Sequence, residues 1–142
     1  MLMQNFMSAA DLGLTEQQKE ALMKTLVLLE TDKLVHVPNH DTLPRPNRFV
    51  PTGERQFSGQ FNMADWNFAH NCGTVCCIGG TAEMIGGVSL DEDGNDGLYQ
   101  LFYPQFDGCK GKSYSSITTS EAATALRSYL TTGDARWDLA VS

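Results

Sequence analysis

The chain has 142 residues, of which 42% are hydrophobic and 19% charged, and this size and composition predict one globular domain over residues 1–142. Its formal net charge of −7, with 10 Lys and Arg residues, argues against nucleic-acid binding, which needs clustered positive charge. The sequence lacks an apolar run of membrane-spanning length and the basic start of a secretory signal, so we expect a cytosolic protein with no membrane partner. Residues 1–14 have no clean hydrophobic period and predict an arm that is either loose or docked.

The first clear element is an amphipathic helix from Thr15 to about Thr31. Thr15 and Gln18 have capping-box spacing. Three leucines then recur at i, i+4 and i+7, which places them on one helix face: they are Leu22, Leu26 and Leu29. Glu20 and Lys24 stand one turn apart on the opposite face, in the order that favours an ion pair.

Residues 34–60 predict a proline-rich insertion. Four of the five prolines fall there, and proline removes a backbone donor, so a long helix is excluded. Residues 34–37 and 48–50 have strand-like composition, which predicts a small β-hairpin in the 34–50 region. Loops of this length are often functional, so residues 38–60 are a candidate binding lid, and a flexible insert is the alternative.

Beyond this insertion, apolar Phe61, Met63 and Trp66 lead into a predicted helix from Gly73 to Ile85. Its apolar positions recur at helical spacing and are Val75, Ile78, Ala82 and Ile85. The pair Gly86-Gly87 supplies a stop, because glycine adopts left-handed backbone angles without steric cost. Gly79 and Gly80 lower the helix propensity, so we expect them to permit close approach of another helix, with close approach of a ligand backbone as the alternative.

The acidic segment 89–97 predicts a solvated turn. It alternates acids like a calcium loop, but Asp96 stands where that loop needs glycine and Phe102 where it needs glutamate. Residues 98–103 predict a short apolar helix or turn.

The last predicted helix begins at Thr118, where Glu121 completes a second capping box, and ends at Gly133. Its buried stripe contains Ala122, Leu126, Tyr129 and Leu130. Trp137, beyond the helix, is expected to fold back on the core. Together these elements predict a mainly α fold, with about three principal helices, shorter helices and the small hairpin.

Candidate chemistry concentrates around the cysteines. A thiol at a helix N-terminus has a lowered pKa, so Cys72 is the candidate nucleophile of a thiol-dependent enzyme, with His70, His36 or His40 as base. A small metal-binding domain is the other alternative, because thiolate and imidazole suit zinc. Its candidate ligands are His70, Cys72, Cys77 and Cys109. The spacing matches neither a papain-like signature nor a zinc pattern, which favours Cys76 and Cys77 as reduced, buried small hydrophobes.

Several motifs in order resemble a family of small uncharacterised proteins of bacteria and their phages: FNMADW, CGTVCCIGGTA, LFYP, ITTSEAATAL and TGDARWDL. The chain departs from the family pattern at Cys76 and Gly79, where alanine is usual, and the resemblance does not cover residues 34–60. The resemblance implies a fold and an origin but no activity. Because no complete catalytic set is found, we expect a non-catalytic phage or prophage accessory protein that acts on an unknown protein partner in the bacterial host cytosol, with no cofactor.

Overall fold

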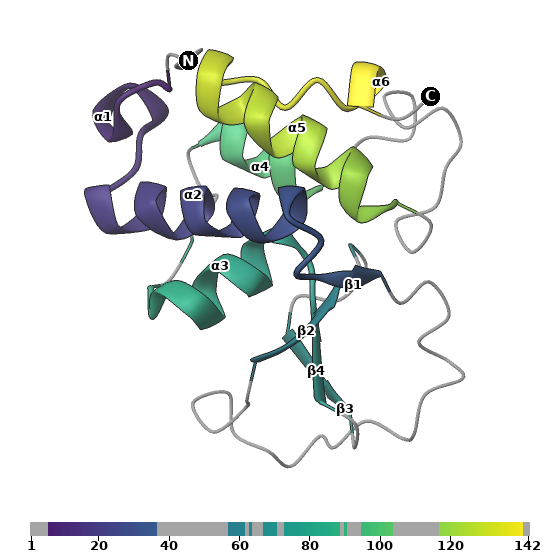
Figure 1. The fold of residues 1–142 in the computed structure, drawn as a ribbon. Helices are drawn as coiled ribbons and strands as arrows, with labels where there is room; N and C mark the ends of the chain where they lie inside the picture. The colour runs from purple at the N-terminus through teal and green to yellow at the C-terminus, as the bar shows by residue number, and fades with distance from the viewer. Residues whose placement is uncertain are drawn as a thin grey trace.

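A computed structural model describes helices and strands from several stretches of the chain. The described residues are 6–36, 57–61, 63, 67–70, 73–88, 90, 95–103 and 117–140. Over these residues the fold is mainly α, which confirms the predicted class. Figure 1 shows the helices gathered together, with a small sheet extending from them beyond α3. The elements in chain order are α1 (Ala9–Leu12), α2 (Glu16–Glu30), β1 (Val35–His36), β2 (Phe57–Phe61), β3 (Asn67–His70), β4 (Gly73–Cys76), α3 (Ile78–Gly86), α4 (Asp96–Phe102), α5 (Thr119–Thr132) and α6 (Trp137–Ala140).

The predicted capping box begins α2. The Thr15 hydroxyl accepts a hydrogen bond from the Gln18 backbone N–H at 3.1 Å, and the Gln18 side chain accepts one from the Thr15 N–H at 2.9 Å. Lys24 and Glu20 form the expected ion pair at 3.4 Å. The predicted leucine face is buried. Burial of each leucine contributes about 1.5–3 kcal/mol, so this face fixes how α2 sits on the rest of the fold.

The second capping box begins α5, as predicted. The Thr118 hydroxyl accepts from the Glu121 N–H at 3.1 Å, and the Glu121 carboxylate accepts from the Thr118 N–H at 2.9 Å. Gly133 ends the helix with φ +83°, a left-handed conformation that favours glycine. Trp137 folds back as expected: its indole N–H is shared between the carbonyls of Gln100 at 3.0 Å and Leu101 at 3.2 Å. The C-terminal segment is therefore tied to α4.

The described part of the N-terminal arm is docked. The Met7 N–H donates to the Leu130 carbonyl at 2.8 Å, and Ser8 caps the short helix α1. Phe6 and Met7 pack against the core. Of the two alternatives for this arm, docking therefore holds for residues 6–14, and residues 1–5 lie outside the described part.

The sheet differs from the predicted hairpin. Its strand order is β1-β2-β4-β3, with β1, β2 and β4 parallel and β3 antiparallel to β4. The first predicted arm, residues 34–37, contains β1, but β1 pairs in parallel with β2, Val35 opposite Gln60 and His36 opposite Phe61. The second predicted arm, residues 48–50, lies outside the described residues.

The predicted helix from Gly73 to Ile85 is wrong over its first five residues. Residues Gly73–Cys76 form β4, which pairs with β2 and β3, and the helix α3 starts at Ile78. Cys77 is its N-cap, where its sulfur accepts a hydrogen bond from the Gly80 N–H at 3.4 Å. The predicted stop is confirmed, because Gly87 caps the end of α3 with φ +63°.

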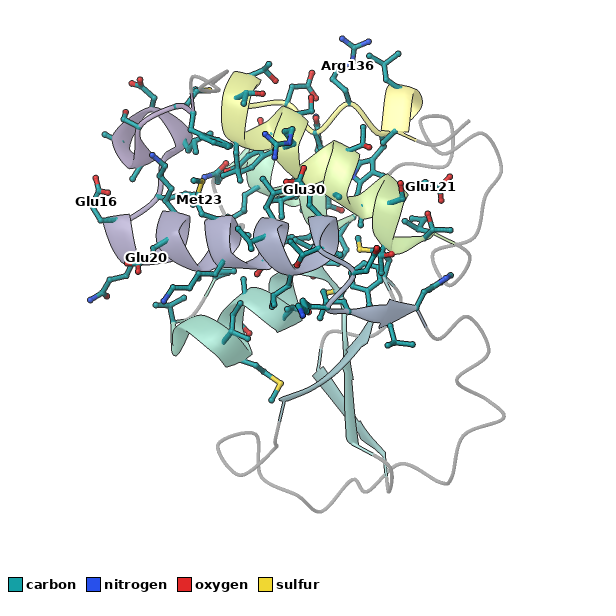
Figure 2. The ribbon with its side chains drawn as sticks, in the orientation of Figure 1. Glu16, Glu20, Met23, Glu30, Glu121 and Arg136 are labelled. Carbon is teal, nitrogen blue, oxygen red and sulfur yellow. The ribbon has the colours of Figure 1, made fainter. Side chains whose placement is uncertain are left out.

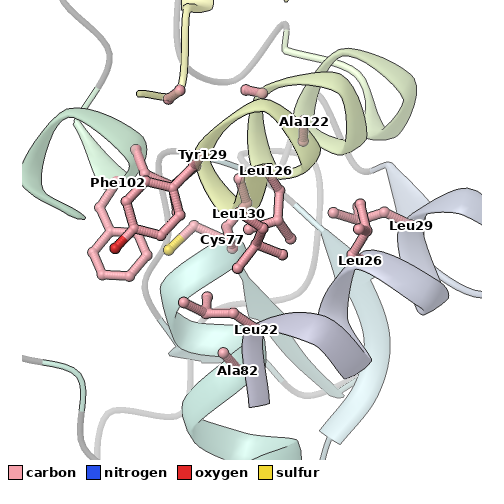
Figure 3. Close-up of a cluster of buried hydrophobic side chains, with 14 of the residues drawn as sticks. Leu22, Leu26, Leu29, Cys77, Ala82, Phe102, Ala122, Leu126, Tyr129 and Leu130 are labelled. Atoms are coloured by element: carbon pink, nitrogen blue, oxygen red, sulfur yellow. The ribbon is translucent and has the colours of Figure 1, made fainter. Parts of the chain in front are cut away.

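The core lies where α2, α3, α4 and α5 meet. Figure 3 shows leucines of α2 facing side chains of α5, with Ala82 of α3 below Leu22 and the N-cap Cys77 beside Tyr129. The largest fully buried side chains are Tyr129, Phe61, Phe102, Leu22, Ile78, Leu98, Leu101, Ile117, Leu126 and Leu130. Met63 is buried as well, whereas Trp66 lies outside the described residues. Helices from both halves of the chain therefore share one core.

Candidate functional site

The only described cysteine side chain, Cys77, belongs to the core. It is 3% exposed, and Figure 3 shows it beside Tyr129 and Phe102. Burial raises the pKa of its thiol to about 12, because the interior disfavours the thiolate. A neutral buried thiol is a poor nucleophile at neutral pH. This agrees with the interpretation of Cys77 as a small hydrophobe.

The structure separates two of the four candidate metal ligands. His70 pairs with Gly73 at one end of β4, whereas Cys77 follows the other end of that strand. An extended strand rises about 3.3 Å per residue, so four residues place the two backbones about 13 Å apart. The backbones of these two residues therefore lie at opposite ends of β4, and the His70 side chain lies outside the described part of the chain. No group of three or more potential ligands occurs among the described residues, and the proposed ligand set stays a prediction.

The helix N-terminus that was expected to activate Cys72 does not follow this residue. Residues Gly73–Cys76 are a strand and α3 begins at Ile78, so Cys72 does not stand at a helix N-terminus. The side chains of Cys72, Cys109 and His40 lie outside the described residues, and the candidate base His36 is half-buried in β1. The positive helix end that was expected to lower the pKa of Cys72 is capped by Cys77 instead.

Asn95, in the acidic segment, has a structural role. Its side-chain oxygen accepts from the Leu98 N–H at 3.0 Å and caps α4, while its amide donates to the Leu12 carbonyl at 2.9 Å. Asn95 thereby joins α1 to α4. The predicted turn over residues 89–97 extends too far, because Asp96 and Gly97 already belong to α4 and Leu90 is buried. Residues 89 and 91–94 lie outside the described part.

The described surface has a groove between α2 and α5, with a volume of about 420 Å³. Two of the side chains that line it, Leu29 and Ala123, are 2% and 7% exposed and form an apolar floor. The other lining residues carry charges or hydroxyls and form the rim: Glu30, Asp32, Ser120, Thr124 and Arg127. We call this feature the α2–α5 groove.

An ion pair holds the two walls of the α2–α5 groove together. The Arg127 Nε donates to one Glu30 oxygen at 2.7 Å and an Arg127 Nη donates to the other, across a sequence separation of 97 residues. Glu30 lies between α2 and α5 in Figure 2. The hydrogen bond to Glu30 raises the pKa of Arg127. The Phe6 ring lies 5.8 Å from the guanidinium carbon, so the docked arm also supports this pair.

The remaining rim combines hydrogen-bonding groups from α5 with an exposed acid from the turn after α2. The Thr124 hydroxyl donates to the Ser120 carbonyl at 3.1 Å, and both side chains are exposed. Asp32 has φ +59°, a left-handed conformation in which Asp and Asn are tolerated best after glycine. The rim therefore presents donors and acceptors around the apolar floor.

Both helices that form the groove were predicted from the sequence, but none of the groove residues was identified as part of a site. The pairing of Glu30 with Arg127 joins residues far apart in the chain, and a single sequence carries no signal for it.

None of the described helices has the length and apolarity needed to cross a bilayer. No protein-family model, curated protein or solved structure matches the chain.

Proposed function

We propose that the chain is a non-catalytic accessory protein of phage or prophage type, which acts in the cytosol of a bacterial host by binding a protein partner. The observation that supports this function best is the α2–α5 groove, with its buried Leu29 and Ala123 and its polar rim. Protein interfaces have the same anatomy, an apolar centre that excludes water and a rim that hydrogen-bonds. A volume of about 420 Å³ accommodates an anchoring side chain of a partner.

The internal bracing of the groove adds to this argument. Arg127 and Glu30 hold α5 against α2 before any partner arrives, and Phe6 lies against Arg127. A wall that is already ordered loses little conformational entropy on binding, so more of the contact energy is available as affinity. The phage origin and the cytosolic location rest on the sequence motifs and composition alone.

The test places a photo-crosslinking residue, p-benzoylphenylalanine, at Thr124 on the groove rim. A matched control carries it at Gln100, which is also exposed but lies on α4, outside the groove. In the host bacterium we expect a discrete crosslinked adduct from position 124 and none from position 100. Equal adducts from both positions, or none from position 124, would contradict binding at this groove.

A second pair of variants tests whether the groove itself is needed. Thr124→Arg fills the groove with a long side chain at an exposed helix position, where folding tolerates it, and Gln100→Arg adds the same charge on α4. We expect Thr124→Arg to reduce recovery of the crosslinked partner at least tenfold in affinity purification and Gln100→Arg to leave it unchanged. Thermal melts of both variants check that neither has unfolded.

The two alternatives, a thiol-dependent enzyme and a metal-binding domain, stay predictions, because Cys72 and Cys109 lie outside the described residues. Native mass spectrometry of protein purified without chelators tests the metal alternative directly. A mass excess of one zinc ion per chain that disappears in Cys72→Ala would contradict the proposed function and support the metal-binding alternative. Rapid alkylation of Cys72 well below pH 8.5 would support the enzyme alternative instead.

A further inference from the structure

No further inference is drawn: the strongest candidate, the pair of carboxylates of Glu30 and Asp32 at the C-terminal end of α2, which would set the charge of a ligand in the α2–α5 groove, carries nothing because Arg127 already pairs with Glu30 and nothing in the described residues shows what covers that end of the helix.

Discussion

Gly86 at the end of α3 lies directly against Ala21 of α2. A Cβ atom added to Gly86 would stand 2.5 Å from the Ala21 Cβ and 3.4 Å from its Cα. Real Cβ atoms essentially never approach a carbon at the shorter distance. The absence of a side chain at Gly86 therefore sets how closely these two helices pack.

Gly86→Ala is expected to destabilise the protein by about 1–3 kcal/mol, because the added methyl group overpacks the contact between α2 and α3. In an unconstrained helix the same change would stabilise by about 1 kcal/mol, so the sign of the effect identifies the cause. Urea denaturation monitored by circular dichroism measures it.

The compensating change is Ala21→Gly, which removes the methyl group that an alanine at position 86 would meet. In the double variant we expect most of the steric cost to disappear, leaving a positive coupling between the two sites of about 1–2 kcal/mol in a double-mutant cycle. Additive effects of the two substitutions would show that the helices do not meet at Gly86.

The close approach at Gly86 was not predicted from the sequence, where this glycine was interpreted only as part of a stop signal. The close approach expected at Gly79 and Gly80 stays a prediction, and both residues are buried in α3. Gly80 lies in the first turn of α3, where its N–H bonds to the Cys77 sulfur. Which glycine meets another helix depends on how α3 packs on α2, and that is not encoded in the local pattern.

The helices α2 and α5 could be predicted because their signals are local. Thr15 and Thr118 each stand three residues before the side chain that completes the box, and the buried residues follow at helical spacing. Strand β4 could not be predicted in this way. Val75 continues the spacing of Ile78, Ala82 and Ile85 backwards, and a four-residue strand is too short for periodicity to distinguish it from a helix.

What makes residues Gly73–Cys76 a strand is pairing with two other strands, the neighbouring β3 and the more distant β2. Phe57, Gln60 and Phe61 of β2 and the residues of β3 supply the backbone partners. The β-branched Thr74 and Val75 were the one local indication of a strand. The groove walls likewise depend on the packing of α2 against α5, which joins the two ends of the chain.

Tyr129 is 1% exposed, and its buried hydroxyl has no hydrogen-bond partner among the described residues. Burying such a group without a partner costs free energy, so Tyr129→Phe is expected to raise the free energy of unfolding by about 1 kcal/mol. Tyr99→Phe, at a side chain that is 46% exposed, is the matched control and should change it by less than about 0.5 kcal/mol. Loss of stability in Tyr129→Phe would mean that the hydroxyl has a partner in solution.

Stability is expected to fall at alkaline pH because of Cys77 and Tyr129. Burial raises both pKa values to about 12, from 9.0 for the thiol and 10.0 for the phenol. At pH values between the unfolded-state and folded-state pKa of a group, the unfolded state has lost a proton that the folded state retains. Each group therefore lowers the free energy of unfolding by up to about 1.4 kcal/mol per pH unit in that range. Urea midpoints from pH 8 to pH 11 should therefore decline in the wild type, and less steeply in Tyr129→Phe. An identical slope in the variant would contradict the burial of the phenol.

The thiol of Cys77 can be followed separately by alkylation. In folded protein at pH 8 we expect iodoacetamide to leave Cys77 unmodified, and in urea to modify it readily, because the thiol is buried and neutral in the fold. Peptide mapping by tandem mass spectrometry distinguishes it from the neighbouring Cys76. Rapid modification of Cys77 in folded protein would show that α3 opens or that its N-cap is exposed.

The ion pair of Arg127 and Glu30 is expected to couple the two halves of the chain more strongly than an ordinary surface pair. Two of the three guanidinium nitrogens bond to the carboxylate. The side chains of Arg127 and Glu30 are 32% and 34% exposed, against 58% and 66% for Lys24 and Glu20. A double-mutant cycle with Arg127→Gln and Glu30→Gln should give a coupling of about 0.5–1 kcal/mol that weakens in high salt. The same cycle at Lys24 and Glu20 should give about 0.3–0.5 kcal/mol, since that pair lies within one exposed helix. Equal coupling energies would mean that the ion pair of Arg127 and Glu30 adds no more than an ordinary surface pair. The contact between α2 and α5 would then depend on the apolar floor of the groove alone.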